Sequence, residues 1–402
     1  MNVRLGDAPT GPCAGMTVLE FSTVFSGPMC AMILGDLGAD VIKIEALRGD
    51  STRMMGPPFK GGLSATFTHF NRNKRSIAID LKQPQGQAIA QHLAQTADVL
   101  VQNFRPGVAE RLGIDYPTLS AHNSKLVYLA ISGFGPDGPY VAQPAYDTVI
   151  QGLTGFMPAQ GATRGPELVK SMIADKSTAL TAAYGVLAAL LARERNGGRG
   201  QLVDLAMLDA FAAFILPESI LRDTFLPTDE WKNLPSLTDI HRTWETADGH
   251  VVMMLIEDPQ FHAMCRVLER EDLIGDERYA NLILRIVNGK ELLPQMEAAL
   301  RKLPTAEVVA RARKYGAPLA PANSVEQFLA DPQVTANRTV FEAEHAEAGQ
   351  IRYLRNPVRF KDTPPSLRRH PPRLGEHTDE ILRHLGYRDA DIAGLRTSAV
   401  IG

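Results

Sequence analysis

The first 130 residues alternate between short apolar runs and segments of helical pattern, and this alternation is the strongest constraint on the fold. The apolar runs are rich in Val, Ile and Leu, and they predict strands at 16–22, 39–45, 77–80, 98–103 and 126–132. Helices are expected between them at 28–37 and 84–96. Strands that alternate with helices form βαβ units, whose strands run parallel. The pattern therefore predicts an α/β fold around a parallel sheet.

The rest of the chain divides into three parts. An Ala- and Leu-rich helix is expected at 176–195, stopped by Asn196-Gly197-Gly198, and 201–208 reads as a strand that runs into a helix. Prolines then interrupt a polar stretch, which indicates a crossing between domains; they are Pro217, Pro227 and Pro235. Beyond it we expect a hairpin at Asp248-Gly249 and helices near 259–270 and 304–314, then a polar segment with a helix at 377–386. The predicted boundaries are a large domain at 1–225, a small α+β domain at 226–335 and a C-terminal segment at 336–402.

The charge balance excludes whole classes of partner. With 42 Lys and Arg against 45 Asp and Glu, the chain has a formal net charge of −3, so we expect no nucleic-acid and no membrane partner. Cys13, Cys30 and Cys265 are odd in number and have no CxxC spacing, which favours a reducing compartment. The first residues lack a signal-peptide core, and the apolar stretch 180–192 is too short to span a bilayer. We therefore expect a cytoplasmic protein.

The sequence contains no segment that meets the requirements of a common cofactor-binding or metal-binding motif. Residues 133–138 match GxGxxG after a strand, but Pro136, Pro139 and Pro144 prevent the helix that a dinucleotide fingerprint must open. The chain has no Walker A loop, no HExxH and no GxSxG, and its histidines have no ligand spacing. We expect no metal site and no permanently bound cofactor.

Asp175 directly precedes the expected helix 176–195. Aspartate is a good N-cap, and that role alone explains an aspartate at this place. A carboxylate there also lies among unpaired N–H groups at the positive end of the helix dipole, where an oxyanion can be stabilised. The residues alone leave both interpretations open, since one side chain can serve in both ways.

Eight segments of the chain, taken in order, carry a resemblance to a known family. They are 18–45 (VLEFSTVFSGPMCAMILGDLGADVIKIE), 71–82 (NRNKRSIAIDLK), 97–113 (ADVLVQNFRPGVAERLG), 129–140 (LAISGFGPDGPY), 146–155 (YDTVIQGLTG), the Asp175 helix with 199–210 (RGQLVDLAMLDA), 317–334 (APLAPANSVEQFLADPQV) and 374–386 (LGEHTDEILRHLG). Together they resemble the class III CoA-transferases, also called the CaiB/BaiF family, over nearly the whole chain.

The resemblance implies a fold and a reaction. It implies a Rossmann-like large domain built from both termini, a small domain from the middle, and two chains interlocked as a homodimer. In such enzymes the aspartate that matches Asp175 attacks an acyl-CoA to form a mixed anhydride and then an aspartyl-CoA thioester, which a carboxylic acid takes over. Coenzyme A and acyl-CoA are then substrates.

Two arguments predict where CoA binds. Its phosphates need cations or helix N-termini, and basic residues lie near the ends of the expected strands, beside a helix opened by Gly27-Pro28; these residues are Lys74, Arg75, Lys82, Arg105 and Arg111. By resemblance, the residues that match CoA contacts of the family are Val24, Ser26, Ile79, Lys82, Asn103, Phe104, Arg111, Ala145, Tyr146 and Met207. The family arginine after the VIKIE strand is Ala46 here, with Arg48 two places on.

Three functions remain open at this level. α-Methylacyl-CoA racemases of the same family place a histidine beside the residue that matches Asp147, where this chain has Tyr146, a poor base at neutral pH. Asp147 is either a substitute base or the cap of a helix at 147–156. CoA transfer is therefore the favoured function, with a racemase as the alternative and a binding protein without turnover as the second.

The acyl and acceptor sites are less defined. Phe25 stands where the formyl-CoA:oxalate branch has a polar residue, and no glycine-rich loop precedes WETADG, so we expect a larger and more apolar acyl group than oxalate. Residues in the variable region that shape the acceptor site, or else pack or lie in loops, are Trp231, Asp239, His241 and Trp244.

Overall fold

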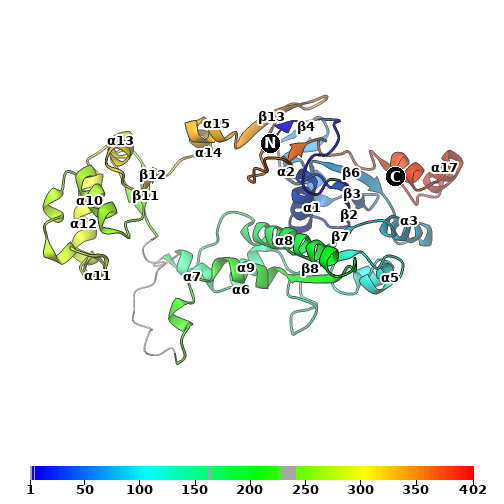
Figure 1. Cartoon of the computed structure of the whole chain (residues 1–402), viewed down its shortest axis with the longest axis horizontal. Helices are drawn as coiled ribbons and strands as arrows, with labels where there is room; N and C mark the ends of the chain where they lie inside the picture. The colour runs from blue at the N-terminus through cyan, green and yellow to red at the C-terminus, as the bar shows by residue number, and fades with distance from the viewer. Residues whose placement is uncertain (1, 4, 162–163, 228–240) are drawn as a thin grey trace. The chain divides into compact units, whose positions relative to one another are not determined.

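The computed structural model describes residues 2–3, 5–161, 164–227 and 241–402 (Figure 1). These residues form two compact units, one of Met1–Leu216 with Thr335–Gly402 and one of Pro217–Val334.

The first unit is built on a six-stranded sheet in which every strand is parallel to its neighbours. In spatial order the strands are β6 (Lys74–Ala78), β3 (Asp40–Glu45), β2 (Thr17–Glu20), β7 (Val99–Gln102), β8 (Val127–Ser132) and β9 (Leu202–Ala206). Counted along the chain this order is 3-2-1-4-5-6, that of doubly wound nucleotide-binding sheets. The predicted α/β fold with a parallel sheet is confirmed, and the strand order reverses between β2 and β7.

Helices cover both faces of this sheet, because side chains alternate along each strand. Val18, Val99 and their equivalents pack under α1 (Ser26–Asp36), α8 (Ile173–Arg195) and α9 (Met207–Ile215). Leu19, Leu100 and their equivalents pack on the other face, against α3 (Pro84–Ala94), α5 (Tyr116–Ser120), α16 (Thr378–His384) and α17 (Asp389–Thr397). The valine-rich runs of the sequence are thus buried on both faces.

The C-terminal segment completes the first unit. The Asp80 N–H donates to the Val400 carbonyl at 2.8 Å, and the His377 N–H donates to the Ser76 carbonyl at 2.9 Å. The remaining strands of this unit are β1 (Asn2–Val3), β4 (Phe59–Lys60), β5 (Leu63–Ser64), β13 (Val340–His345), β14 (Gly349–Leu354) and β15 (Ser366–Leu367). Its remaining helices are α2 (Ala65–Asn71), α4 (Val108–Arg111), α6 (Asp147–Leu153), α7 (Phe156–Gly161) and α15 (Pro332–Asn337), which extends across the division.

The second unit is a small α+β body. Its antiparallel sheet consists of β10 (Thr243–Glu245), β11 (His250–Met253) and β12 (Leu319–Pro321). Its helices are α10 (Asp258–Val267), α11 (Leu282–Val287), α12 (Gly289–Leu300), α13 (Thr305–Tyr315) and α14 (Val325–Ala330). The predicted hairpin at Asp248-Gly249 is confirmed, and the Asp248 carboxylate accepts from the Thr305 N–H at 2.7 Å.

The beginnings of two elements are displaced by three residues, and the GxGxxG segment behaves as predicted. Both β6 and α8 begin three residues before the positions expected from the sequence. Between β8 and α6 the chain forms turns and no helix, so 133–138 does not have the geometry of a dinucleotide fingerprint. Among the described helices, none combines the length and the apolar character that a membrane crossing requires.

Candidate active site

The candidate site lies where two helices begin beside the point at which the strand order reverses. α1 follows β2 and α8 packs against α1, which brings Ser26 and Asp175 together. The Ser26 Oγ–H donates a hydrogen bond to Asp175 Oδ1. In open α/β sheets, ligands bind outside the carboxyl ends of the strands at this reversal. The position predicted for the reactive carboxylate therefore coincides with the place where this fold binds ligands.

Asp175 is not the N-cap of its helix. α8 begins at Ile173 with Met172 as N-cap, so Asp175 is the third residue of the helix and the expectation of an N-cap is wrong. Its N–H donates instead to Asp147 Oδ2 at 3.1 Å. The capping carboxylate thus comes from a segment 28 residues earlier, which no local pattern could reveal. The Asp175 carboxylate is thereby left without a capping role.

The environment of Asp175 makes it more basic than an ordinary aspartate. Burial raises the pKa of Asp175 to about 6, the Ser26 hydroxyl acts to lower it, and the charge of Asp147 raises it further. The residue is 9 % exposed. The carboxylate is therefore largely ionised at pH 7.5 and, being poorly solvated, a better nucleophile than a surface aspartate.

The Asp147 carboxylate accepts hydrogen bonds from two groups of the protein. It is buried, its Oδ1 accepts from Gln151 Nε2 at 2.6 Å, and its Oδ2 accepts from the Asp175 N–H. It is also the first residue of α6, whose N-cap is Tyr146, so the expected cap of this helix is wrong as well. Tyr146 is 64 % exposed. Asp147 therefore accepts a hydrogen bond within the protein on each of its two carboxylate oxygens.

The loop between β2 and α1 is strained and clamped. Val24 has φ +71°, a left-handed conformation that is unfavourable for a β-branched residue. The neighbouring Thr23 exchanges two hydrogen bonds with the Asn103 side chain, at 2.9 Å from its N–H and 2.8 Å to its carbonyl. The Asn103 amide thus ties the loop after β2 to the end of β7. Phe25 is buried and meets the Phe70 ring edge-on at 5.0 Å.

The residues expected to contact CoA have different surroundings. Arg48, Lys82, Arg105 and Arg111 are exposed and follow the carboxyl ends of β3, β6 and β7. Phe104 and Ala145 are partly buried. Ile79 and Met207 are buried in the core, where their side chains pack against protein.

Two of the predicted basic residues are already paired. Lys74 is fully buried with its Nζ 2.7 Å from Glu20 Oε2, so the expectation that it faces a phosphate is wrong. Arg75 is paired with Asp40 and, at 3.0 Å, with Glu380. Both residues lie at the beginning of β6, and the Lys74 side chain extends to Glu20 at the end of β2.

Of the four expected acceptor residues, His241 and Trp244 lie within the described part of the chain. Trp231 and Asp239 lie outside the described residues. Trp244 is buried in the core of the second unit, with the Arg242 guanidinium 4.3 Å from its ring centre. His241 is exposed.

Sequence reasoning missed a buried ionic cluster behind the strained loop. Glu20, Lys43, Asp50 and Lys74 are each at most 2 % exposed and are joined by ion pairs of 2.7 to 3.0 Å. Two of its members carried a signal, because Glu20 directly follows the apolar residues of β2 and Lys43 stands between two isoleucines in β3.

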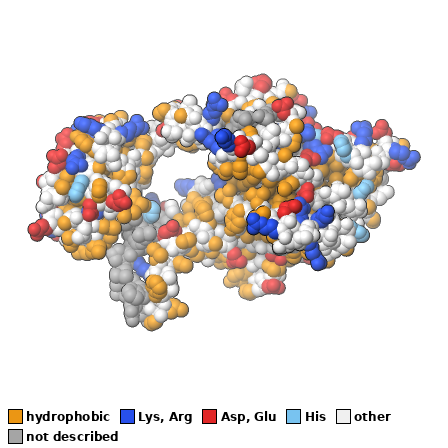
Figure 2. All heavy atoms as spheres, in the orientation of Figure 1, with side chains coloured by type: hydrophobic (Ala, Val, Ile, Leu, Met, Phe, Trp, Pro, Cys, Tyr) orange, Lys and Arg blue, Asp and Glu red, His pale blue; other side chains and the backbone are white. Residues whose placement is uncertain are grey.

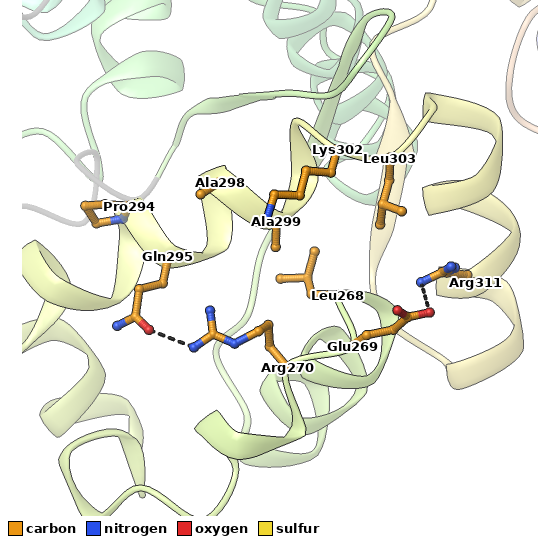
Figure 3. Close-up of a pocket in the computed structure, with 10 residues that line it drawn as sticks. All are labelled: Leu268, Glu269, Arg270, Pro294, Gln295, Ala298, Ala299, Lys302, Leu303 and Arg311. Atoms are coloured by element: carbon orange, nitrogen blue, oxygen red, sulfur yellow. Dashed lines mark hydrogen bonds and ion pairs between the residues drawn. The ribbon is translucent and has the colours of Figure 1, made fainter.

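The second unit contains a surface cavity of about 590 Å³, and it is a poor candidate for catalysis (Figure 3). It lies between the end of α10 and the helices α12 and α13. Its arginines are neutralised, because Arg270 pairs with Asp272 at 2.7 Å and Arg311 with Glu269 at 2.8 Å. No residue expected to act in catalysis lines it.

The cysteines do not compete with Asp175 as nucleophiles. Cys13, Cys30 and Cys265 are free and buried. Burial raises the pKa of Cys30 to about 12 and that of Cys13 to about 11, so neither forms a thiolate at neutral pH.

Comparison with known proteins shows the family of this chain. The model of CoA-transferase family III matches residues 13–378. The chain is 34 % identical to the succinate–glutarate CoA-transferase of Agrobacterium fabrum, over 93 % of this chain and 96 % of that protein. It is 32 % identical to the human succinyl-CoA:glutarate CoA-transferase, over 97 % of this chain and 90 % of that protein. A crystal structure of a CaiB/BaiF family protein from Brucella suis superimposes with a TM-score of 0.81 at 32 % identity, covering 94 % of this chain and 100 % of that one.

The family match extends over most of the chain and includes both units. The relatives named above are CoA-transferases, and the alignments with this chain cover nearly their whole length. The chain therefore belongs to CoA-transferase family III, of the CaiB/BaiF type, and is a CoA-transferase.

Proposed function

We propose that Asp175 is the nucleophile that carries CoA from an acyl-CoA donor to a carboxylic acid acceptor. The observation that supports it best is the state of this carboxylate. It has one oxygen held by Ser26, a pKa raised to about 6, and a position at the reversal of strand order. Such a group is ionised at neutral pH and poorly solvated, which is what attack on a thioester requires.

The reaction proceeds by four exchanges at carbonyl carbons. Asp175 attacks the thioester, an Asp–CO–O–CO–R anhydride forms, and CoA leaves as its thiolate. The thiolate attacks the aspartyl carbonyl, which gives the aspartyl-CoA thioester and releases the donor carboxylate. The acceptor carboxylate attacks this thioester, and the released thiolate then attacks the acceptor carbonyl and restores the Asp175 carboxylate. No net proton transfer is needed, because the nucleophiles and leaving groups are all anions.

Ser26 acts at two stages of this scheme. While it holds Oδ1, Oδ2 is the oxygen that attacks the donor. In the acylated enzyme Oδ1 is the aspartyl carbonyl oxygen, which becomes an oxyanion when the thiolate adds. A donor already directed at that atom stabilises this oxyanion without reorganisation.

The hydrogen bonds of Asp147 favour CoA transfer over racemisation. Racemisation needs two bases beside one carbon. Asp147 accepts hydrogen bonds from Gln151 and from the Asp175 N–H, which hold it within the protein, and Tyr146 is a weak base at neutral pH. The site thus offers one reactive carboxylate, which suffices for transfer.

Names of the relatives guide the choice of substrates. Two of them are named for succinate or succinyl-CoA and glutarate, so we propose dicarboxylic acids of four and five carbons as the first donor and acceptor pair. The alternative predicted from Phe25 is a larger apolar acyl group. An assay should therefore compare succinyl-CoA with an unbranched apolar acyl-CoA of six to eight carbons.

One experiment tests the proposal as a whole. The enzyme is incubated with each acyl-CoA in deuterated buffer, and the intact mass of the protein and the deuterium content of the substrate are measured. We expect a CoA or acyl adduct that maps to Asp175, and no exchange beside the thioester carbonyl. Exchange without an adduct would support a racemase, and an adduct on another residue would contradict the assignment of the nucleophile.

The pH dependence of the reaction follows from the state of Asp175. Its pKa is raised to about 6, and only the ionised form attacks. We expect kcat/KM to fall tenfold per pH unit below about 6 and to level off above it. Initial rates between pH 4.5 and 8 with saturating acceptor measure this. A profile that stays flat down to pH 4.5 would mean that the reacting group has an ordinary carboxyl pKa.

The homodimer is a further part of the proposal. Exposed apolar side chains follow one another on α8 at helical spacing; they are Leu180, Tyr184, Leu187 and Leu191. Figure 2 shows apolar side chains gathered over the middle of the larger unit. A stripe of this kind on a single chain favours burial against another protein surface, here a second copy.

An interlocked dimer makes a specific prediction. Light scattering should give about twice the 43.8 kDa mass of one chain, and dilution to nanomolar concentration should not reduce it. Two differently tagged pools should form no mixed dimers when incubated together, but should form them after joint unfolding and refolding. Mixed dimers without unfolding would show an ordinary dimer, and a mass of one chain would exclude both.

A further inference from the structure

Behind the strained loop, two lysines each donate from a buried ammonium group to a backbone carbonyl. The Lys43 Nζ is 2.9 Å from Glu20 Oε1, 2.9 Å from the Ser22 carbonyl and 3.0 Å from Asp50 Oδ2. The contacts to Glu20 and to the Ser22 carbonyl are hydrogen bonds, and the contact to Asp50 is an ion pair. Lys43 thus holds the loop at its start, directly after β2.

The second lysine holds the other end of the same segment. The Lys74 Nζ is 2.7 Å from Glu20 Oε2, 2.8 Å from Asn71 Oδ1 and 2.9 Å from the Pro28 carbonyl. Pro28 lies in the first turn of α1. Glu20 joins the two lysines through its two oxygens.

A third member reaches the strained residue itself. Asp50 Oδ1 accepts from the Val24 N–H at 3.4 Å and from the Thr52 N–H at 2.9 Å. The segment is closely packed at Gly27, since a Cβ there would lie 2.2 Å from the Ser22 side chain. The segment 22–28 is therefore fixed at its beginning, middle and end, and Ser26 lies within it.

The two positive and two negative charges of this cluster balance. A contribution to stability does not by itself distinguish the cluster from a set of apolar side chains. Two carboxylates and two ammonium groups are removed from water, and such sets are often no more stabilising than apolar side chains of the same volume. What apolar side chains cannot supply is a donor at a defined backbone carbonyl.

We propose that Glu20, Lys43, Asp50 and Lys74, the buried quartet, are positioning residues that fix segment 22–28 and thereby hold the Ser26 hydroxyl on the Asp175 carboxylate. This inference rests on the proposed role of Asp175 as nucleophile. The quartet touches neither substrate nor reacting atoms and acts through Ser26 alone. Disturbing it should change the rate of the chemical step more than the binding of acyl-CoA.

A charge-balanced variant tests this. Glu20→Gln with Lys74→Met removes one charge of each sign, so no buried charge is left alone, and it removes the donor to the Pro28 carbonyl. We expect kcat to fall about 10- to 100-fold, as for a displacement of about 1 Å at a reacting group. The KM for acyl-CoA should change less than about threefold, since binding contacts are kept.

The pH profile provides a readout that a purely structural role would not change. The Ser26 hydroxyl lowers the pKa of Asp175, whereas burial and Asp147 raise it. If the hydroxyl no longer donates, the acid limb of kcat/KM should move above about 6. Among the described residues, Asp147 on α6 is the charged group that acts on Asp175, and the variant leaves it unchanged.

A matched control lies at the other end of α1. Arg72 and Asp36 form a buried ion pair at 2.6 Å, and Asp36 is the last residue of the helix. Asp36→Asn with Arg72→Met should lower the unfolding midpoint but leave kcat within about twofold of wild type, because it lies away from the reacting group. Its acid limb should remain near 6.

Ser26→Ala supplies the decisive comparison. If the quartet acts through Ser26, adding the quartet variant to Ser26→Ala should change kcat and the acid limb little further. Additive losses would overturn the proposal, as would an unmoved limb with kcat within about threefold of wild type. Equal shifts in the Asp36/Arg72 control would also overturn it. Should the double variant fail to fold, the isosteric Asp50→Asn must produce a smaller shift in the same direction.

The result also separates this inference from the proposed function. A wild-type enzyme with no limb near pH 6 and no adduct on Asp175 contradicts both. A wild-type enzyme with both features, and a quartet variant with the same limb, contradicts positioning alone.

Discussion

Asp175→Ala is expected to abolish turnover while acyl-CoA still binds. Removing the nucleophile of a covalent mechanism lowers kcat by at least about 10³-fold, because the remaining site can only orient substrates. Acyl-CoA affinity, measured by calorimetry, should stay within about threefold, since the cations at the carboxyl edge are untouched. Asp209→Ala is a matched control, because Asp209 is an exposed carboxylate in the first turn of the neighbouring α9. Full activity of Asp175→Ala would refute the proposed mechanism.

The same substitution should affect stability in a pH-dependent way. The pKa of Asp175 is about 6 in the folded chain against 3.8 ordinarily, so the folded state binds more protons between these values. Ionisation of Asp175 therefore weakens folding as pH rises from about 4 to 6, by about 3 kcal/mol at full extent. As pH rises from 4 to 7.5, the unfolding midpoint of the variant should increase relative to the midpoint of the wild type, with both proteins at equal concentration. A constant difference would indicate an ordinary pKa.

Lys43→Met alone should destabilise the fold strongly. Burial acts to lower the pKa of Lys43, but the charges of Glu20 and Asp50 outweigh it and raise the pKa above its ordinary value. Without the ammonium group, two buried carboxylates remain with one cation, Lys74. Removing one partner from a buried ion pair costs about 3 to 5 kcal/mol, which denaturant unfolding can measure.

Two controls make this result specific. Lys125→Met removes an exposed lysine and should change the free energy of unfolding by less than about 0.5 kcal/mol. Lys43→Met combined with Asp50→Asn restores the charge balance and should recover part of the loss. A loss below about 1 kcal/mol in Lys43→Met would mean that water reaches the cluster or that the carboxylates take up a proton.

The sheet could be predicted from the sequence because its signal is local. Runs such as 39–45 and 98–103 are rich in Val, Ile and Leu and are buried on both faces, as in a covered parallel sheet. Helix beginnings were less predictable. α8 starts three residues early, and Asp147, distant in sequence, accepts from the Asp175 N–H in its first turn. A capping group from another segment leaves no mark on the local pattern.

The sequence by itself determined the parallel α/β core, the family resemblance and the identity of Asp175 as the reactive candidate. Only the tertiary structure decided how Asp175 is held. It is not an N-cap, its Oδ1 accepts a hydrogen bond from Ser26, and burial raises its pKa. It also decided that Lys74 faces Glu20 inside the protein and not a phosphate outside it. The physical reason is that burial and charge pairing depend on which segments meet in space. Composition and periodicity report only on neighbours along the chain.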